Sequence, residues 1–437
     1  MYISLSSSPP EPSDDLPGAE TPTGHSRSGR VSSVVITLGI VSMLTDISSE
    51  STAAILPLYI TGALGLSTIA YGFIDGLYQG VSALVRIAGG WAADRGDHPK
   101  WVAFAGYGLS AVARIGLLFA TGFASIIAVV TADRLGKGLR TAPRDALISA
   151  ASQRQSIGRA FGTHRMLDTI GAAAGPLLAF VILLLIPDGY HTVFLVSLAF
   201  AVLGVVLLVV LVPNLRPQAR RRAGRGGAQG TESSPVERRV RLRLLADPRL
   251  RRVLVVAGIL GLVTIGDGFI YLLLQSRDGF AALWFPLLYV GTNIAFLLLA
   301  IPCGRLADRL GSGRVFVMGH LALLGAYLCA AAPSLGAVTT IFCLLLLGAF
   351  YASTDGVLAA LAAVNTPVAA RATGIAAAQT VVALTRLVAS VGFGVLWFAV
   401  GQSIAVLIVA SALAVAIVVA GVLVRGIAST AEGSEGL

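Results

Sequence analysis

The sequence contains few charged residues and few cysteines. Only 12% of its 437 residues are charged, against about 25% in a typical soluble domain, so a soluble globular fold is a poor fit. The three cysteines, Cys303, Cys329 and Cys343, show neither the spacing of metal ligands nor the pattern of a disulfide framework. These absences argue against a metal site and against a disulfide-stabilised secreted domain.

Motifs for catalysis and nucleotide binding are missing as well. Lys137 lies in Gly-Lys-Gly, but the phosphate-binding pattern G-x-x-x-x-G-K-[ST] does not occur, and the five histidines are scattered. No loop carries a recognisable nucleophile or metal cluster. We therefore expect no enzymatic activity, no cofactor and no metal, and an energy source other than ATP.

Long apolar runs dominate what is present. Apolar residues make up 56% of the chain, and the runs 192–212 and 403–424 contain 21 and 22 residues without a charge. An α-helix rises about 1.5 Å per residue, so about 20 apolar residues cross a hydrocarbon layer of about 30 Å. The sequence predicts an all-α membrane protein.

Twelve transmembrane helices are predicted, and the basic residues between them orient the chain. The spans cover residues 34–61, 68–92, 101–122, 125–149, 160–186, 191–212, 252–276, 281–303, 314–332, 336–363, 371–399 and 402–424. With the amino terminus inside, nearly all connecting basic residues are cytoplasmic, and the opposite side holds at most Arg277. The positive-inside rule thus predicts a multi-pass protein of a bacterial cytoplasmic membrane, with both termini in the cytoplasm.

The segments outside the spans differ in composition. Residues 1–33 are rich in Ser and Pro, so we expect a disordered cytoplasmic tail and no cleaved signal peptide. Twelve of the 32 basic residues lie in Arg216–Arg252, which indicates a basic cytoplasmic linker at 213–251. Beside membrane helices, such a cluster favours contact with anionic lipid, not nucleic acid. Residues 426–437 form a second cytoplasmic tail.

An internal repeat relates the two halves of the chain. Three pairs of matching positions recur at offsets of 210 to 214 residues. The pairs are Gly90 and Gly304, Asp145 and Asp355, and Gly162 and Gly374. The repeat predicts two pseudo-symmetric six-helix bundles, 34–212 and 252–425, with a site at their interface near the middle of the membrane.

The repeated loop motif carries a resemblance to a known family. The pattern G-x-x-x-D-R/K-x-G-R-R/K matches at Gly90, Asp94 and Arg95, and then departs at 97–99. The second copy fits further, at Gly304, Asp308, Arg309, Gly311 and Arg314. Through these residues the chain resembles the major facilitator superfamily over residues 34–425. The resemblance implies a secondary transporter that works by alternating access.

Two further matches concern the mode of transport. Proton-driven exporters of this superfamily carry R-x-x-Q-G, and here Arg134, Lys137 and Gly138 stand at those positions, with Lys in place of Gln. They also tend to carry G-x-x-x-G-P, matched at Gly171, Gly175 and Pro176, which allows close helix packing and a bend. The resemblance therefore implies proton-coupled export and a role for Arg134 in proton movement.

One segment of the chain resembles a prokaryotic subfamily of this superfamily whose substrates are largely unassigned. The segment is residues 133–147, D-R-L-G-K-G-L-R-T-A-P-R-D-A-L.

Ionisable residues within the spans are concentrated in the first half. The first half holds Asp46, Glu50, Asp75, Asp133, Asp145 and Asp168 with Arg86, Arg114, Arg134, Lys137, Arg140, Arg144 and Arg165, and the second half holds Asp267, Asp355 and Arg386. Such groups are costly in the bilayer and either pair with each other or face a functional cavity. Acidic and basic residues occur in nearly equal numbers, so the sequence is compatible with both interpretations.

Three carboxylates are the predicted proton-coupling groups. Asp46 and Glu50 share a helix face at i, i+4 spacing, and Asp75 is expected at a similar outer depth with few bases nearby. At least one should then hold a proton near neutral pH, with Glu50 the first choice and Asp46 the second. Arg134 would compete with the proton, and the alternative is a structural pairing with Arg114.

The remaining candidates divide between a substrate cavity and a cytoplasmic gate. The cavity candidates are Arg114, Lys137, His164, Arg165, Asp168, Asp267 and Arg386. His164, Arg165 and Asp168 share one helix face, which a local salt bridge explains equally well. The gate candidates are Gly90, Asp94, Arg95, Gly304, Asp308, Arg309 and Arg371, where a carboxylate would bind a helix amino terminus or Arg371 and latch the halves together.

The sequence thus favours a monomeric, proton-coupled exporter of a small organic compound. Import, or movement of an anionic metabolite or siderophore, is the alternative if the Arg-rich first half binds an anion. A non-transporting receptor or regulator on the same fold is the alternative of another class.

Overall fold

The computed structural model describes residues 31–95, 99–152, 156–214, 247–333, 336–367 and 371–432. Across these ranges every regular element is a helix. Ten helical segments of the described chain are long and apolar enough to cross a membrane, and α2 and α4, which carry more charge, complete the twelve spans. The predicted twelve-helix membrane fold is confirmed.

The first six spans form one bundle. Its helices are α1 (Ser33–Leu58), continued by the π-helical turn η1 (Tyr59–Ala63), α2 (Thr68–Arg95), α3 (Pro99–Leu118), α4 (Phe123–Ala150), α5 (Ile157–Leu185) and α6 (Tyr190–Leu211). Within the bundle α1 packs on α5 and α6, and α4 packs between α2 and α3. This packing directs the charged faces of α1, α4 and α5 toward one another.

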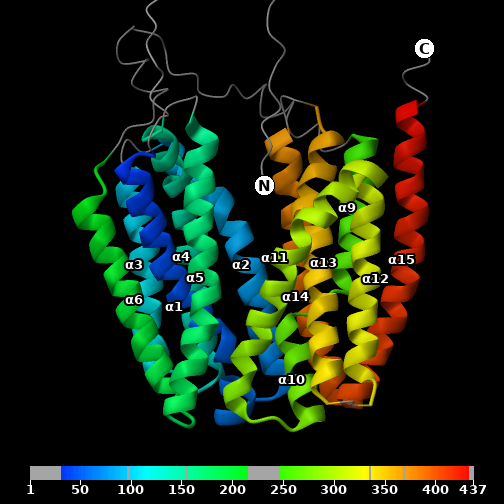
Figure 1. Cartoon of the computed structure of the whole chain (residues 1–437), viewed down its shortest axis with the longest axis horizontal. Helices are drawn as coiled ribbons and strands as arrows, with labels where there is room; N and C mark the ends of the chain where they lie inside the picture. Colours follow the sequence, from blue (N-terminus) through cyan, green and yellow to red (C-terminus); the bar gives the residue numbers. More distant parts are fainter. Residues whose placement is uncertain are drawn as a thin grey trace, which may run out of the picture.

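The second six spans form the other bundle, which lies beside the first in Figure 1. Its helices are α9 (Pro248–Leu262), α10 (Asp267–Asp278), α11 (Phe285–Leu310), α12 (Ser312–Ala331), α13 (Ala337–Val364), α14 (Arg371–Val400) and α15 (Gln402–Glu432). A 3-10 turn, Ala282–Trp284, precedes α11. The bundles pack on each other through α2 with α14 and α5 with α11.

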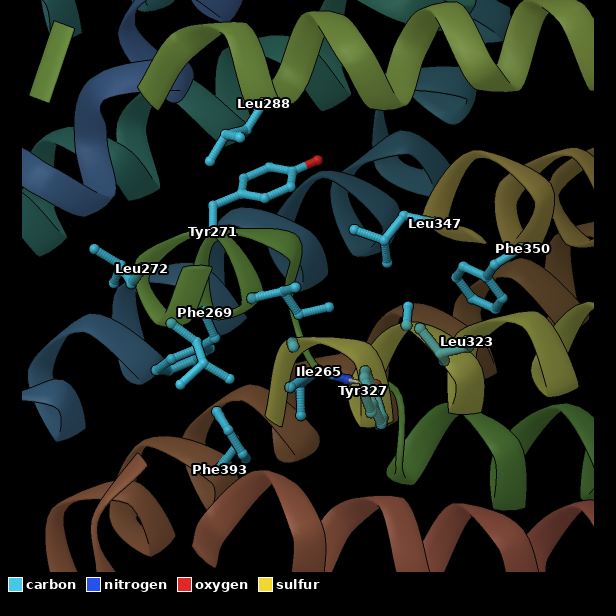
Figure 2. Close-up of a cluster of buried hydrophobic side chains, with 14 of the residues drawn as sticks. Ile265, Phe269, Tyr271, Leu272, Leu288, Leu323, Tyr327, Leu347, Phe350 and Phe393 are labelled. Atoms are coloured by element: carbon cyan, nitrogen blue, oxygen red, sulfur yellow. Dashed lines mark hydrogen bonds between the residues drawn. The ribbon is translucent and has the colours of Figure 1, made fainter. Parts of the chain in front are cut away.

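The seventh span is broken, where a single helix over 252–276 was expected. Helix α9 ends at Leu262 and α10 begins at Asp267, so several backbone groups lose their helical partners. Tyr327 of α12 bridges the break: its hydroxyl accepts a hydrogen bond from the Ile265 amide at 2.9 Å and donates one to the Val263 carbonyl at 3.2 Å. Figure 2 shows Tyr327 beside Ile265 within the buried apolar cluster. The break is tolerated because its polar groups are satisfied inside the protein.

The two bundles are in close contact at one end, called here the outer end because the predicted topology places it outside. This end carries the α1–α2 and α5–α6 connections. Gly76 of α2 lies so near α14 that a Cβ would come within 2.9 Å of the Leu387 carbonyl oxygen. Phe269 of α10 packs against Tyr71 of α2, with ring centroids 4.7 Å apart, and against Phe393 of α14 at 4.9 Å. Small residues and aromatic rings thus seal the outer end.

Candidate functional site

Two arginines share one buried carboxylate in the first bundle. An Arg114 Nη2 atom lies 3.1 Å from Asp133 Oδ1, and Arg134 pairs with the other oxygen of the same carboxylate. All three side chains are buried. The Arg134 guanidinium also stacks on the Tyr78 ring, 3.8 Å from its centroid. Arg114 therefore pairs with Asp133 and not with the outer acids.

Asp46 and Glu50 face cations, contrary to the expectation that few bases share their depth. Lys137 Nζ lies 3.5 Å from Glu50 Oε1 and 4.0 Å from Asp46 Oδ1, and Arg140 Nη2 lies 3.8 Å from Asp46. The expectation was wrong because α4 contacts α1, and the long side chains of Lys137 and Arg140 reach the acids from α4. The side chains of Lys137 and Glu50 remain 33% and 29% exposed, so this part of the network is accessible.

Asp75 belongs to a different environment from Asp46 and Glu50. Its carboxylate accepts a hydrogen bond from Ser390 Oγ on α14, across the interface between the bundles. It also lies against Gly266, at the break between α9 and α10. The three predicted proton-coupling acids therefore do not form one group.

Arg386 of α14 lies among three acids near the interface between the bundles: Asp75, Asp267 and Asp355. Arg386 is the cation whose field acts on Asp75 and Asp267, and it acts on Asp355 together with Arg165. Asp267 also accepts a 2.7 Å hydrogen bond from the Tyr351 hydroxyl. This cluster carries an excess of acid, and it faces the break in the seventh span.

Helix α5 contributes a local salt bridge and a link to α1. Arg165 lies 3.2 Å from Asp168, so the local salt bridge that the sequence left open is formed, and Arg144 of α4 lies 3.8 Å from the same aspartate. Arg144 also donates a 2.9 Å hydrogen bond to Ser42 Oγ of α1, so it links α5 to α1. His164 is buried, and neither ring nitrogen has a partner in the part of the chain that the structure describes.

The α5 glycines explain how α1 and α5 come so close. A Cβ at Gly171 would collide with the Met43 carbonyl oxygen, and one at Gly175 would lie 2.8 Å from the Ser51 amide nitrogen. Pro176 follows inside the same helix. These small residues allow the two backbones to approach closely.

Among the described residues, the predicted latch between the cytoplasmic ends of the two bundles is not formed. The side chains of Gly90, Asp94 and Arg95 lie outside the described residues. Asp308 and Arg309 at the end of α11, and Arg371 at the start of α14, are exposed. Of the ion pairs described, none includes Asp308 or Arg371. The latch remains a prediction for a state in which the cytoplasmic ends approach.

Tyrosines complete the site, and the sequence reasoning did not assign them to it. Tyr78 borders two small pockets, one with Arg114 and Asp133 and the other with Asp75 and Tyr289. Tyr289 lies close enough to Asp267, Asp75 and Glu50 to interact with them electrostatically. Helical spacing was the available signal, because Tyr71, Asp75 and Tyr78 follow one face of α2.

Comparison with known proteins agrees with this architecture. The family model of the Major Facilitator Superfamily matches residues 38–390. An uncharacterized MFS-type transporter of Methanocaldococcus jannaschii is 28% identical over 368 residues, covering 83% of this chain and 88% of the relative. An uncharacterized protein of Mycobacterium tuberculosis is 33% identical over 144 residues, covering 33% of this chain and 35% of the relative.

Solved structures share the fold. The nucleoside transporter NupG superposes with a TM-score of 0.74 at 16% identity, covering 90% of this chain and 99% of NupG. A POT family transporter in complex with 5-aminolevulinic acid superposes with a TM-score of 0.72 at 14% identity, covering 91% of this chain and 97% of the other.

Proposed function

Because this chain belongs to the major facilitator superfamily and is a multi-pass membrane transporter, we propose that it moves a small organic solute in exchange for protons by alternating access. The observation that carries the proposal is the mid-depth network around Asp46, Glu50 and Lys137, which is partly accessible and combines acids with a partly exposed cation. A carrier that uses a proton gradient needs a carboxyl group that binds and releases a proton within the membrane.

The closed outer end supports a state that exchanges with the cytoplasm. Aromatic packing of Phe269 with Tyr71 and Phe393 joins the bundles at that end. The latch residues Asp308 and Arg371 are exposed at the other end. In the proposed cycle the solute enters from the cytoplasmic side, the latch ends come together, and the aromatic contacts separate to release it outside.

The export direction is proposed from Arg134, Lys137 and Gly138, which stand at the exporter positions. The alternative is transport of an anionic metabolite or siderophore, in either direction. It is favoured by Arg165, whose side chain is 79% exposed, and by the accessible Lys137. Both alternatives use the same network of charged side chains and differ in the charge of the solute.

The test begins with a ligand screen on the purified protein. Thermal unfolding with drugs, metabolites and siderophores at two pH values identifies ligands that stabilise the folded protein. Each ligand is then offered to proteoliposomes with and without a pH gradient. We expect gradient-driven accumulation of at least one ligand by the wild type.

Variants then separate coupling from binding. Asp46→Asn and Glu50→Gln should lose gradient-driven accumulation, and Glu50→Gln should retain exchange of solute down its gradient. Asp145→Asn is the matched control, because Asp145 lies 3.1 Å from Arg144 and is 42% exposed. Full gradient-driven activity in Asp46→Asn, Glu50→Gln and Asp75→Asn alike would refute proton coupling through these acids. Ligand binding with no flux would favour a receptor.

A further inference from the structure

We propose that Cys329 of α12 and Cys343 of α13 form an oxidisable thiol pair, which hydrogen peroxide converts into a disulfide between the two helices at the outer end of the second bundle. This modification site is independent of the proposed proton coupling. The spacing of the cysteines in the sequence did not indicate a pair, and the comparisons assign no role to either residue.

Each thiol of the pair is hydrogen-bonded to the backbone of the other helix. Cys329 Sγ lies 3.3 Å from the Thr339 carbonyl oxygen, and Cys343 Sγ lies 3.5 Å from the Ala326 carbonyl oxygen. In an α-helix the carbonyl of residue i accepts the amide of residue i+4, so the Thr339 carbonyl is also the partner of the Cys343 amide. The two contacts run in opposite directions between the same helical turns and place the thiols side by side.

Close packing of α12 on α13 provides the short backbone separation that a disulfide requires. The Cα atoms of a disulfide lie about 4.4 to 6.8 Å apart. Gly325, one turn before Cys329, lies so near α13 that a Cβ there would come within 3.3 Å of Leu346 Cδ1. Ala326 beside it is fully buried. Small residues thus let the two backbones approach at the level of the cysteines.

The end of α10 holds this corner of the bundle together. Arg277 donates hydrogen bonds to the Cys329 carbonyl at 2.8 Å and to the Ala332 carbonyl at 3.3 Å. Asp278 accepts a 2.6 Å hydrogen bond from Thr340 Oγ1. Helix α10 therefore connects the end of α12 to the start of α13, and these bonds limit the movement of the backbone that carries the thiols.

The different exposure of the two thiols determines the order of oxidation. Cys329 is partly exposed, whereas Cys343 is fully buried. Hydrogen peroxide oxidises the Cys329 thiol to a sulfenic acid and is reduced to one water. The Cys343 sulfur then attacks the Cys329 sulfur, the S–O bond breaks, and the hydroxyl group leaves with the Cys343 proton as a second water. A dithiol reductant reverses the reaction by thiol–disulfide exchange.

The disulfide would restrain the outer half of the broken span. Because Arg277 and Asp278 connect α10 to both neighbouring helices, a covalent bond between α12 and α13 joins the three ends into one unit. Helix α10 also carries Phe269, whose ring packs against Tyr71 of the first bundle. Oxidation therefore restrains a helix that takes part in the contact between the bundles.

The test counts thiols in the purified full-length protein and requires no solute. The chain has three cysteines, and Cys303 lies apart from the pair on α11, where Ser353 donates a hydrogen bond to its sulfur at 3.4 Å. After treatment with hydrogen peroxide, unfolding and alkylation with a maleimide, the number of reactive thiols should fall from three to one. Reduction should restore all three. Mass spectrometry of the digested wild type should show peptides joined through Cys329 and Cys343.

Single substitutions distinguish the pair from unrelated oxidation. Cys303→Ser should still lose two thiols, whereas Cys329→Ser and Cys343→Ser should form no disulfide within the chain. The peptide measurement uses the wild type, so it is decisive even if a substitution prevents folding. Retention of three thiols, sulfinic acid on Cys329 without a linked peptide, or a linkage through Cys303 would each overturn the proposal.

Hydrogen exchange tests the restraint on α10. The amides of α10 should exchange more slowly in the oxidised protein than in the reduced protein, while those of α3 in the first bundle should exchange at the same rate in both. Equal exchange of the α10 amides in the two forms would overturn the restraint.

Discussion

The two bundles share a repeat but differ in their interiors. The first bundle contains a connected set of ion pairs on α1, α3, α4 and α5. In the second, the ion pair of Arg277 with Asp278 lies at the outer end, and the interior is mainly apolar and aromatic, as Figure 2 shows. We propose that the bundles divide the work of transport: the first bundle binds solute and couples it to protons, and the second bundle contributes to the gate through the break in its first span.

The largest effect is expected at the buried triad of the first bundle. Asp133→Asn leaves Arg114 and Arg134 buried without a counter-charge, and should lower the free energy of unfolding by about 3 to 5 kcal/mol. Asp355→Asn, at an exposed position in the second bundle, should change it by less than about 0.5 kcal/mol. Denaturant unfolding of the purified proteins measures both. Equal losses would remove the contrast between the bundles.

The bridge across the broken span should matter next. Tyr327→Phe removes a hydroxyl that satisfies both the Ile265 amide and the Val263 carbonyl, and should cost about 1 to 3 kcal/mol of unfolding free energy. The control is Tyr59→Phe, which loses one 3.2 Å hydrogen bond to the Ala120 carbonyl and should cost about 1 kcal/mol or less. A smaller loss for Tyr327→Phe than for the control would show that the break does not depend on Tyr327.

A substitution at the outer end, where the bundles are in close contact, should change the conformation of the protein more than its stability. Gly76→Leu places a side chain against the Leu387 backbone and should separate the bundles at the outer end. Spin labels at Ser67 and Ser403, in a background without the native cysteines, should then report a longer distance. Gly108→Leu is the control, because a Cβ at Gly108 meets nothing within 4 Å. An unchanged distance in Gly76→Leu would mean that α2 and α14 do not determine closure.

Much of the fold could be predicted from the sequence because its signals are local. Most spans are long apolar runs, and the Asp94 and Asp308 motifs reveal the repeat. The break after Leu262 was missed because the apolar run continues through it; Gly266 before Asp267 was the available signal. A bridge from a distant helix, through Tyr327, has no local signature.

The site could be predicted only in part. The sequence identified the ionisable residues, since any charge inside a bilayer is conspicuous. It did not predict their partners, because these depend on how each helix is rotated and how far long side chains reach. Lys137 therefore meets Glu50 at 3.5 Å, and Asp75 instead contacts Ser390 on the other bundle.

The most direct test of the division of labour is solute accumulation in proteoliposomes driven by a pH gradient, compared between Asp46→Asn in the first bundle and Asp267→Asn in the second. Asp46→Asn should abolish accumulation while solute binding persists. Asp267→Asn should slow transport but still reach accumulation above equilibrium, because Asp267 accepts a hydrogen bond from Tyr351 beside the break in the seventh span and, in the proposed cycle, a first-bundle acid carries the proton. Loss of accumulation in Asp267→Asn, with full accumulation in Asp46→Asn, would contradict the account.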